Sequence, residues 1–211
     1  MTNTEIKKIY DRYLSDEIPS DFKLDKGILY KSPVKDVLVG FCFERSSSEK
    51  ESLYVWSFAM PLYIEKEDLS LTFGHRLRNK KNQDLWHLKN NPSIDKVVKD
   101  LIALMEKEIE NFFPKVEKPN DFFEYYRNEK VKNIRINEAL TYSAIYSERK
   151  ESKELLESFI NELKNEDLEI GWINSVLQNA TNMKELLQSG DGVSTLFDKN
   201  IELTKTHLKV A

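Results

Sequence analysis

The spacing of apolar residues changes at Pro92, and this change constrains the fold more than any other feature of the sequence. Before it, the stretch VLVGFCFE has large apolar residues at every second position (Val37, Val39, Phe41 and Phe43). After it, apolar residues recur at every third or fourth position from Ile94 to Phe112. A period of two is typical of a strand and a period near 3.6 of a helix. We therefore predict strands before Pro92 and a long helix over 94–113 that ends at Pro114.

The segments before Pro92 favour one helix followed by an antiparallel meander. TEIKKIYDRYL has helical spacing, with Thr4 as the expected N-cap. FKLDKGILYKS carries the turn signal Asp-Lys-Gly, and SLYVWSFAMPLYI is apolar on both sides, as in a central strand covered twice. DLSLTFGHRL predicts a further strand that finishes at Gly74. The links are too short for the crossovers of a parallel sheet.

The segments after the long helix predict more helices. DFFEYYRNEK is a short aromatic helix with a possible capping arrangement of Asp121 and Glu124. Three amphipathic stretches follow between residues 134 and 188, the sequence Gly-Asp-Gly at 190–192 breaks the pattern, and STLFDKNIELTKTHL suggests a last helix. The predicted fold class is α+β: an N-terminal helix plus an antiparallel β-meander of 3–5 strands covered by a long helix, then a helical C-terminal part. We expect an α+β domain over 1–131 and a helical region over 132–211.

Composition excludes several classes of protein. The 211 residues include 11 Phe and 9 Tyr, which argues against disorder, and no apolar run approaches the roughly 18–20 residues of a membrane span. The first residues are rich in acids, so no signal peptide is expected. A single cysteine, Cys42, excludes an internal disulfide and favours a reduced, cytoplasmic protein. The bias of lysine over arginine suggests an AT-rich bacterial genome.

No pattern of catalytic, metal-binding or cofactor-binding residues stands out. Three histidines without HxH, HExxH or CxxC spacing predict no zinc site, while the 36 acidic residues leave a carboxylate Mg²⁺ site open and their spacing selects none, so no metal ligand is predicted. The absence of GxxxxGK[ST] and GxGxxG predicts no bound nucleotide cofactor. Cys42 lies between two phenylalanines, where a buried inert thiol is the expected state. No catalytic residue is therefore predicted.

The basic loop, residues 75–89, is the densest cluster of positive charge in the chain. It suggests a solvated or partner-facing loop, a nucleic-acid contact with Trp86 stacked on a base, or, least favoured, a catalytic loop. If residues 71–77 form a strand, Arg76 and Arg78 share one face, while His75 and Leu77 share the other. Overall net charge is −4, which argues against general nucleic-acid binding. The candidate contact residues are Arg76, Arg78, Lys80, Lys81, Trp86, His87 and Lys89.

Aromatic residues in the second half of the chain are candidates for contact with a protein partner, namely Tyr125, Tyr126 and Trp172. We expect a non-catalytic protein–protein interaction protein: an accessory or adaptor subunit, or an immunity-type partner, of a multi-protein bacterial system, with the helical C-terminal part docking the partner. Two alternatives remain open. One is a nucleic-acid-binding or processing protein that uses the basic loop. The other is a small-molecule enzyme with a pocket between sheet and helices.

Overall fold

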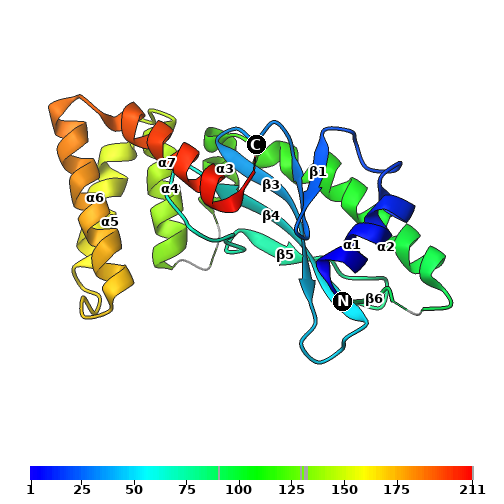
Figure 1. Cartoon of the computed structure of the whole chain (residues 1–211). Helices are drawn as coiled ribbons and strands as arrows, with labels where there is room; N and C mark the ends of the chain where they lie inside the picture. The colour runs from blue at the N-terminus through cyan, green and yellow to red at the C-terminus, as the bar shows by residue number, and fades with distance from the viewer. Residues whose placement is uncertain (90, 129, 131–132, 211) are drawn as a thin grey trace. The chain divides into compact units, whose positions relative to one another are not determined.

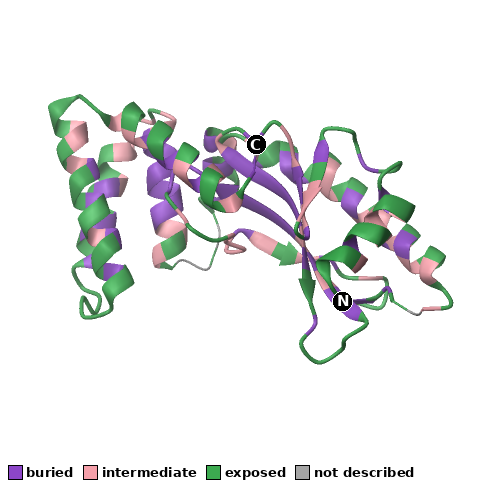
Figure 2. Cartoon of the chain, in the orientation of Figure 1, coloured by how far each residue is buried: buried purple, intermediate pink, exposed green. Residues whose placement is uncertain are grey.

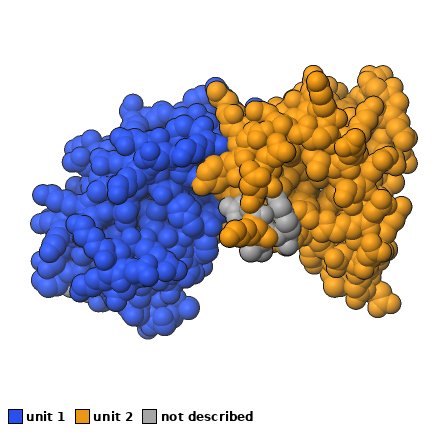
Figure 3. All heavy atoms as spheres, turned by 180° about the vertical axis from the view of Figure 1, so that it is seen from behind, with its two compact units in different colours: residues 1–60, 73–117, 211 blue, residues 61–72, 118–210 orange. Residues whose placement is uncertain are grey.

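The chain divides into two compact units in the computed structural model, which describes residues 1–89, 91–128, 130 and 133–210 (Figure 3). Unit 1 contains residues 1–60 and 73–117, and unit 2 contains residues 61–72 and 118–210. A twelve-residue piece from the middle of the first half thus belongs to the same unit as the C-terminal helices. The expected domain boundary after residue 131 stays a prediction.

Unit 1 is built on an antiparallel meander, as predicted (Figure 1). The sheet has the order β1-β2-β3-β4-β5, and β6 pairs with β4 outside this path. Lys26 and Gly27, with φ of 45° and 88°, form the turn of the first hairpin. Positive φ at both positions gives a turn whose twist matches that of the paired strands. The strands are β1 Phe22–Asp25, β2 Ile28–Lys31, β3 Val37–Arg45, β4 Ser52–Pro61, β5 Gly74–Arg76 and β6 Leu85–His87.

The edge of the sheet near β5 differs from the prediction. The strand expected to finish at Gly74 begins there, and β6 was not predicted. Both strands are three residues long and both pair with the long strand β4, Arg76 opposite Trp56 and Trp86 opposite Leu53. Pairing with β4 therefore determines the positions of β5 and β6. Three residues are too few to show the alternation of apolar residues by which a strand is predicted.

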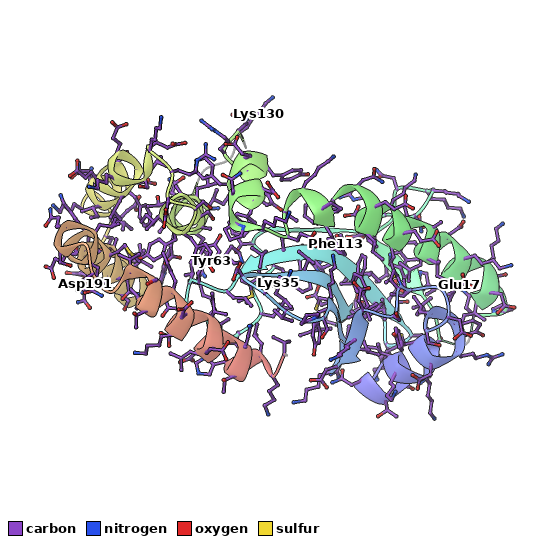
Figure 4. All side chains as sticks on the ribbon, turned by 90° about the horizontal axis from the view of Figure 1, so that it is seen from above. Glu17, Lys35, Tyr63, Phe113, Lys130 and Asp191 are labelled. Atoms are coloured by element: carbon purple, nitrogen blue, oxygen red, sulfur yellow. The ribbon has the colours of Figure 1, made fainter. Side chains whose placement is uncertain are left out.

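The long helix covers the sheet within unit 1, as predicted. It is α2, Ile94–Asn111, followed by a 3-10 turn over Phe113–Lys115. Ser57 in β4 donates a hydrogen bond of 2.8 Å to Glu108 of α2. The ring of Phe113, labelled in Figure 4, lies 5.1 Å from that of Phe41 in β3. Aromatic packing of this kind closes the core between helix and sheet.

The N-terminal helix begins earlier than expected. It is α1, Asn3–Ile9, and continues as a π-helix over Tyr10–Leu14. The predicted N-cap Thr4 is wrong, because Thr2 occupies that position. Thr2 accepts from the Glu5 backbone N–H while the Glu5 carboxylate accepts from Thr2, a capping box.

Unit 2 contains five helices among its described residues, and the predicted break at residues 190–192 is confirmed by positive φ at Gly190 and Gly192. The capping arrangement expected from Asp121 and Glu124 is wrong. The helix starts at Pro119, whose missing N–H suits the first helical position. The helices are α3 Pro119–Tyr126, α4 Ile134–Tyr146, α5 Ser152–Leu163, α6 Gly171–Ser189 and α7 Val193–Leu208.

Residues 61–72 are held in unit 2 by buried polar contacts. The hydroxyls of Tyr63 and Ser143 share a hydrogen bond, and Asn200 Nδ2 donates to the Tyr63 carbonyl at 3.0 Å. Thr204 accepts from the Lys66 backbone N–H. These bonds fix the segment to α4 and α7.

Both-sided burial, predicted for β4, extends to β3 as well (Figure 2). Most helices bury one side, but α4 is buried on all sides from Glu138 to Ile145. In the part of the chain that is described, no helix combines the length and apolar character needed to cross a membrane.

Candidate functional site

Arg76, in the basic loop, lies in a compact cluster of its own unit. Its guanidinium is 3.8 Å from the ring centre of Tyr54 and within 3.3 Å of carboxylate oxygens of both Glu44 and Asp84. Its hydrogen bond holds the pKa of the Asp84 carboxyl below the ordinary value. Arg76 is therefore already neutralised by two acids, which reduces the positive charge available to a phosphate.

Two lysines of the basic loop are also paired. Lys80 meets Asp100 of α2 at 2.6 Å, and Lys89 meets Glu5 of α1 at 2.8 Å. Lys81 is exposed, and within the described residues its ammonium forms no ion pair. The basic loop carries far less free charge than its sequence suggests.

The remaining loop residues serve the local fold. Trp86 is 1% exposed, and its indole N–H donates to the Leu77 carbonyl at 3.1 Å, so its ring offers no face to a base. Arg78 lies beyond the end of β5, outside the strand that was expected to align it with Arg76, and donates to the Asn82 side chain. Trp86 is thus the anchor of the loop.

A serine, a histidine and a glutamate meet at each of two places in unit 1, and neither meeting has the order of a catalytic triad. Ser57 and His75 both approach Glu108, so the acid separates the hydroxyl from the imidazole. A serine nucleophile instead bonds to the histidine directly.

The second cluster contains the candidate residue His87. Ser52 Oγ lies 2.7 Å from His87 Nδ1, and Glu49 lies 3.3 Å from the same nitrogen. A triad uses both imidazole nitrogens, one for the hydroxyl and one for the acid. Ser52 has no exposed surface, so a substrate cannot reach it as it stands.

The predicted partner contacts of α3 differ in exposure. Tyr125 is 42% exposed, whereas Tyr126 is 8% exposed and packs against the ring of Phe122 at 4.8 Å. Tyr126 therefore belongs to the core of unit 2, and Tyr125 lies partly exposed on its surface.

The third aromatic candidate, Trp172, lies in an unusual stretch. Residues 164–172, called the exposed segment below, are nine exposed residues in succession that link α5 to the first turn of α6. Four large hydrophobic side chains are exposed in the described part of the chain, and three lie in this segment: Leu168, Ile170 and Trp172, at 38%, 42% and 44%. Scattered apolar residues are normal on surfaces, but a cluster marks an interaction site.

A pocket of about 640 Å³ opens beside Trp172 within unit 2. Its walls come from residues 64–67, from α4, from α6 between Trp172 and Asn182, and from α7. Arg135 of α4, which also lines the pocket, lies 5.0 Å over the Trp172 ring. These two side chains also line a second, more open hollow that contains Glu162 and Glu166. The Arg135–Trp172 pair thus stands between two concave surfaces.

Polar groups with unused bonding capacity line the inside of the pocket. Glu138 is 4% exposed, and Lys66 approaches its Oε2 at 3.2 Å. Within the described residues, Glu138 Oε1 accepts no hydrogen bond. Tyr142 is also 4% exposed, and no described group bonds to its hydroxyl. Burial, with the Glu138 charge adding to it, raises the pKa of Tyr142 far above its ordinary value, so the hydroxyl keeps its proton.

The pocket was missed from the sequence because four separate segments build it. Trp172 was a candidate from the sequence, whereas Leu168 and Ile170 were not. They could have been found, because they are apolar residues at alternate positions in an acid-rich stretch directly before a helix.

The described residues contain no group of three or more His, Cys, Asp or Glu side chains able to hold a metal ion. No protein-family model, curated protein or solved structure matches this chain.

Proposed function

We propose that this chain is a non-catalytic protein-binding protein, an accessory or adaptor subunit or an immunity-type partner in a multi-protein bacterial system. Unit 2 docks the partner through the exposed segment. The single observation that carries the proposal is the clustering of Leu168, Ile170 and Trp172 on the surface. The cytoplasm remains the expected compartment.

The local sequence of the exposed segment is poorly suited to stability. Ile170 occupies the N-cap of α6, where its side chain makes no capping bond, and Gly171 fills the first helical position. Among the described helices of unit 2, α4 has a capping side chain, Asn133, which accepts from the Ile136 backbone N–H, whereas α3, α5 and α7, like α6, have none; the isoleucine, not the missing cap, is what sets α6 apart. Local rules are broken most often where function requires it. An exposed isoleucine at an N-cap is therefore better explained by a partner than by the helix.

The partner that fits is a basic segment with apolar side chains. The exposed segment carries three acids, Glu166, Asp167 and Glu169, against the single base Lys164. By sequence, unit 2 has 14 Lys and Arg against 19 Asp and Glu, a net charge of −5. An apolar centre with a charged rim is the usual anatomy of an interface, and opposite charge on the partner speeds association.

The test is co-expression of the tagged full chain with the products of adjacent genes, since adaptor subunits are commonly encoded beside what they serve. We expect a stoichiometric complex with wild type and with Gln178→Glu, and none with Trp172→Glu. Gln178 is an exposed position on α6 that does not line the pocket, so it adds the same charge as a control. Circular dichroism checks that each variant is folded.

Three outcomes reject the proposal. The first is a complex that survives Trp172→Glu unchanged, and the second is the absence of a complex with any neighbour. The third is a wild-type chain that dimerises in sedimentation and loses the dimer with Trp172→Glu, because a second copy then covers the exposed segment.

A small-molecule site is the second candidate function, and the pocket is the observation that favours it. Its volume lies within the range of ligand sites, and polar groups converge inside it. The pocket lies among helices and residues 64–67 of unit 2, not against the sheet as the alternative assumed. The melting temperature of the chain, measured with each metabolite of a panel, tests this candidate. If no metabolite raises the melting temperature, the candidate is rejected.

A further inference from the structure

We propose that the pocket beside Trp172 receives an arginine side chain of the protein partner. This inference rests on the proposed function and gives the partner a specific chemical feature. It is carried by three buried side chains that line one pocket, Glu138, Tyr142 and Asn200, each of which has one polar oxygen without a hydrogen bond among the described residues.

The first step is the inventory of unused groups. Glu138 uses only Oε2, in its pair with Lys66. Asn200 is 8% exposed and donates through Nδ2 to the Tyr63 carbonyl, which leaves Oδ1 as an acceptor. The Tyr142 hydroxyl forms no bond within the described residues. The pocket therefore presents mainly acceptors. None of these oxygens is fully buried, since Arg76 Nε is the only fully buried unpaired side-chain atom among the described residues, so a ligand in the pocket can reach them.

The second step is charge. Three carboxylates line the pocket, those of Glu65, Glu67 and Glu138, against two cations. Both cations are engaged: Lys66 pairs with Glu138, and Arg135 stacks over Trp172. A further anion would find its cations already used. A further cation would find exposed carboxylates at residues 65 and 67 without a described partner.

The third step is shape and valence. A guanidinium is a planar group that carries five N–H donors and no acceptor, so it can serve several acceptors at once. It also stacks on aromatic faces, and Trp172, which is 44% exposed, lines the pocket. An ammonium has three donors and no plane, so it satisfies the same groups less well. The exposed segment is acidic, which favours the same kind of partner.

The experiment titrates the full-length chain, labelled with ¹⁵N, with N-acetyl-arginine N-methylamide. The chain has three tryptophans, so its indole N–H groups give three signals. We expect the Trp172 signal to shift and saturate in the millimolar range, as for a ligand of this size. The signals of Trp56 and Trp86 stay in place, because both lie in unit 1.

The citrulline analogue is the matched probe, because it keeps the shape of arginine and removes the charge. We expect no saturable shift with it, and none with the glutamate analogue. Glu138→Gln weakens binding of the arginine probe by about tenfold or more, the loss expected for a charge-assisted hydrogen bond. Tyr142→Phe weakens it by a few-fold at an unchanged melting temperature, because the hydroxyl makes no internal bond. Glu185→Gln, at an exposed position of α6 outside both the pocket and the exposed segment, leaves the affinity at the wild-type value.

The inference is overturned by an absent or non-saturating shift, by equal binding of arginine and citrulline probes, or by Glu138→Gln binding as wild type does. If that variant fails to fold, the wild-type probe comparison and Tyr142→Phe decide. A partner that requires Trp172 while the arginine probe does not bind leaves the proposed function intact and rejects only the pocket's role. If the arginine probe binds but no partner requires Trp172, the proposed function is rejected and the affinity of the pocket for arginine stands.

Discussion

Replacing Ile170 separates what the exposed segment does for the fold from what it does for a partner. Ile170 has the extended backbone of an N-cap, φ −73° and ψ 103°, but has no side-chain acceptor. In Ile170→Ser the hydroxyl accepts a bond from the first turn of α6, and in Ile170→Ala nothing does. Both variants lose the isoleucine, so their difference isolates the cap.

The magnitude follows from the structure. Full burial of an isoleucine side chain stabilises a fold by roughly 1.5–3 kcal/mol. Because Ile170 is 42% exposed, either substitution loses somewhat more than half of this energy, or about 1–2 kcal/mol. A serine cap is worth about 1 kcal/mol over alanine. We expect Ile170→Ser to be close to wild type or slightly less stable. Ile170→Ala falls about 1 kcal/mol below it, which is about 2–4 °C in melting temperature for a chain of this size.

The assay is urea unfolding followed by far-ultraviolet circular dichroism, with the complex recovered in parallel by co-purification. Both variants should lose partner affinity equally, because neither has the apolar side chain, although their stabilities differ. Equal stability of the serine and alanine variants would refute the N-cap argument. Retention of the partner by the serine variant would refute the assignment of Ile170 to the interface.

Three further predictions concern the core. In Gly40→Ala the new Cβ would lie 2.3 Å from the Leu29 carbonyl oxygen, so the free energy of unfolding measured in urea should fall by about 1–3 kcal/mol. An unchanged free energy of unfolding contradicts this prediction. Burial raises the pKa of Cys42 to about 11, so its reaction with a disulfide reagent should accelerate with each pH unit up to about pH 11; a plateau near pH 9 contradicts the burial. Tyr63→Phe removes a buried hydrogen bond to Ser143 and should cost about 1–2 kcal/mol in unfolding free energy, with a measurable coupling to Ser143→Ala in a double-mutant cycle.

Long elements with a clear period were predictable from the sequence. The helix from Ile94 ends within two residues of the expected position, and the Asp-Lys-Gly turn has the positive φ values that its glycine suggested. β4 ends at Pro61, where a residue without an N–H cannot continue the ladder. These features depend on local chemistry, which a sequence contains.

Features that depend on tertiary partners were not predictable. Trp86 reads equally as a ligand contact or an anchor, and only its bond to Leu77 decides between them. The positive charge of Arg76 is cancelled by Glu44, which is 32 residues away in the sequence. The pocket joins Glu138 and Asn200, which no spacing rule connects. The density of charged residues along the sequence therefore overestimated the free positive charge of the basic loop, and no pattern in the sequence indicated the pocket.

The twelve residues from 61 to 72 leave one unit, lie in the other and return. A chain cut after residue 117 would keep Leu62 and Tyr63, both without exposed surface in the intact protein, but would lack the helices that enclose them. The complementary fragment would miss one wall of its own interior. Either fragment expressed alone would therefore expose apolar surface that the intact chain buries, so the two units are expected to fold only as parts of one chain.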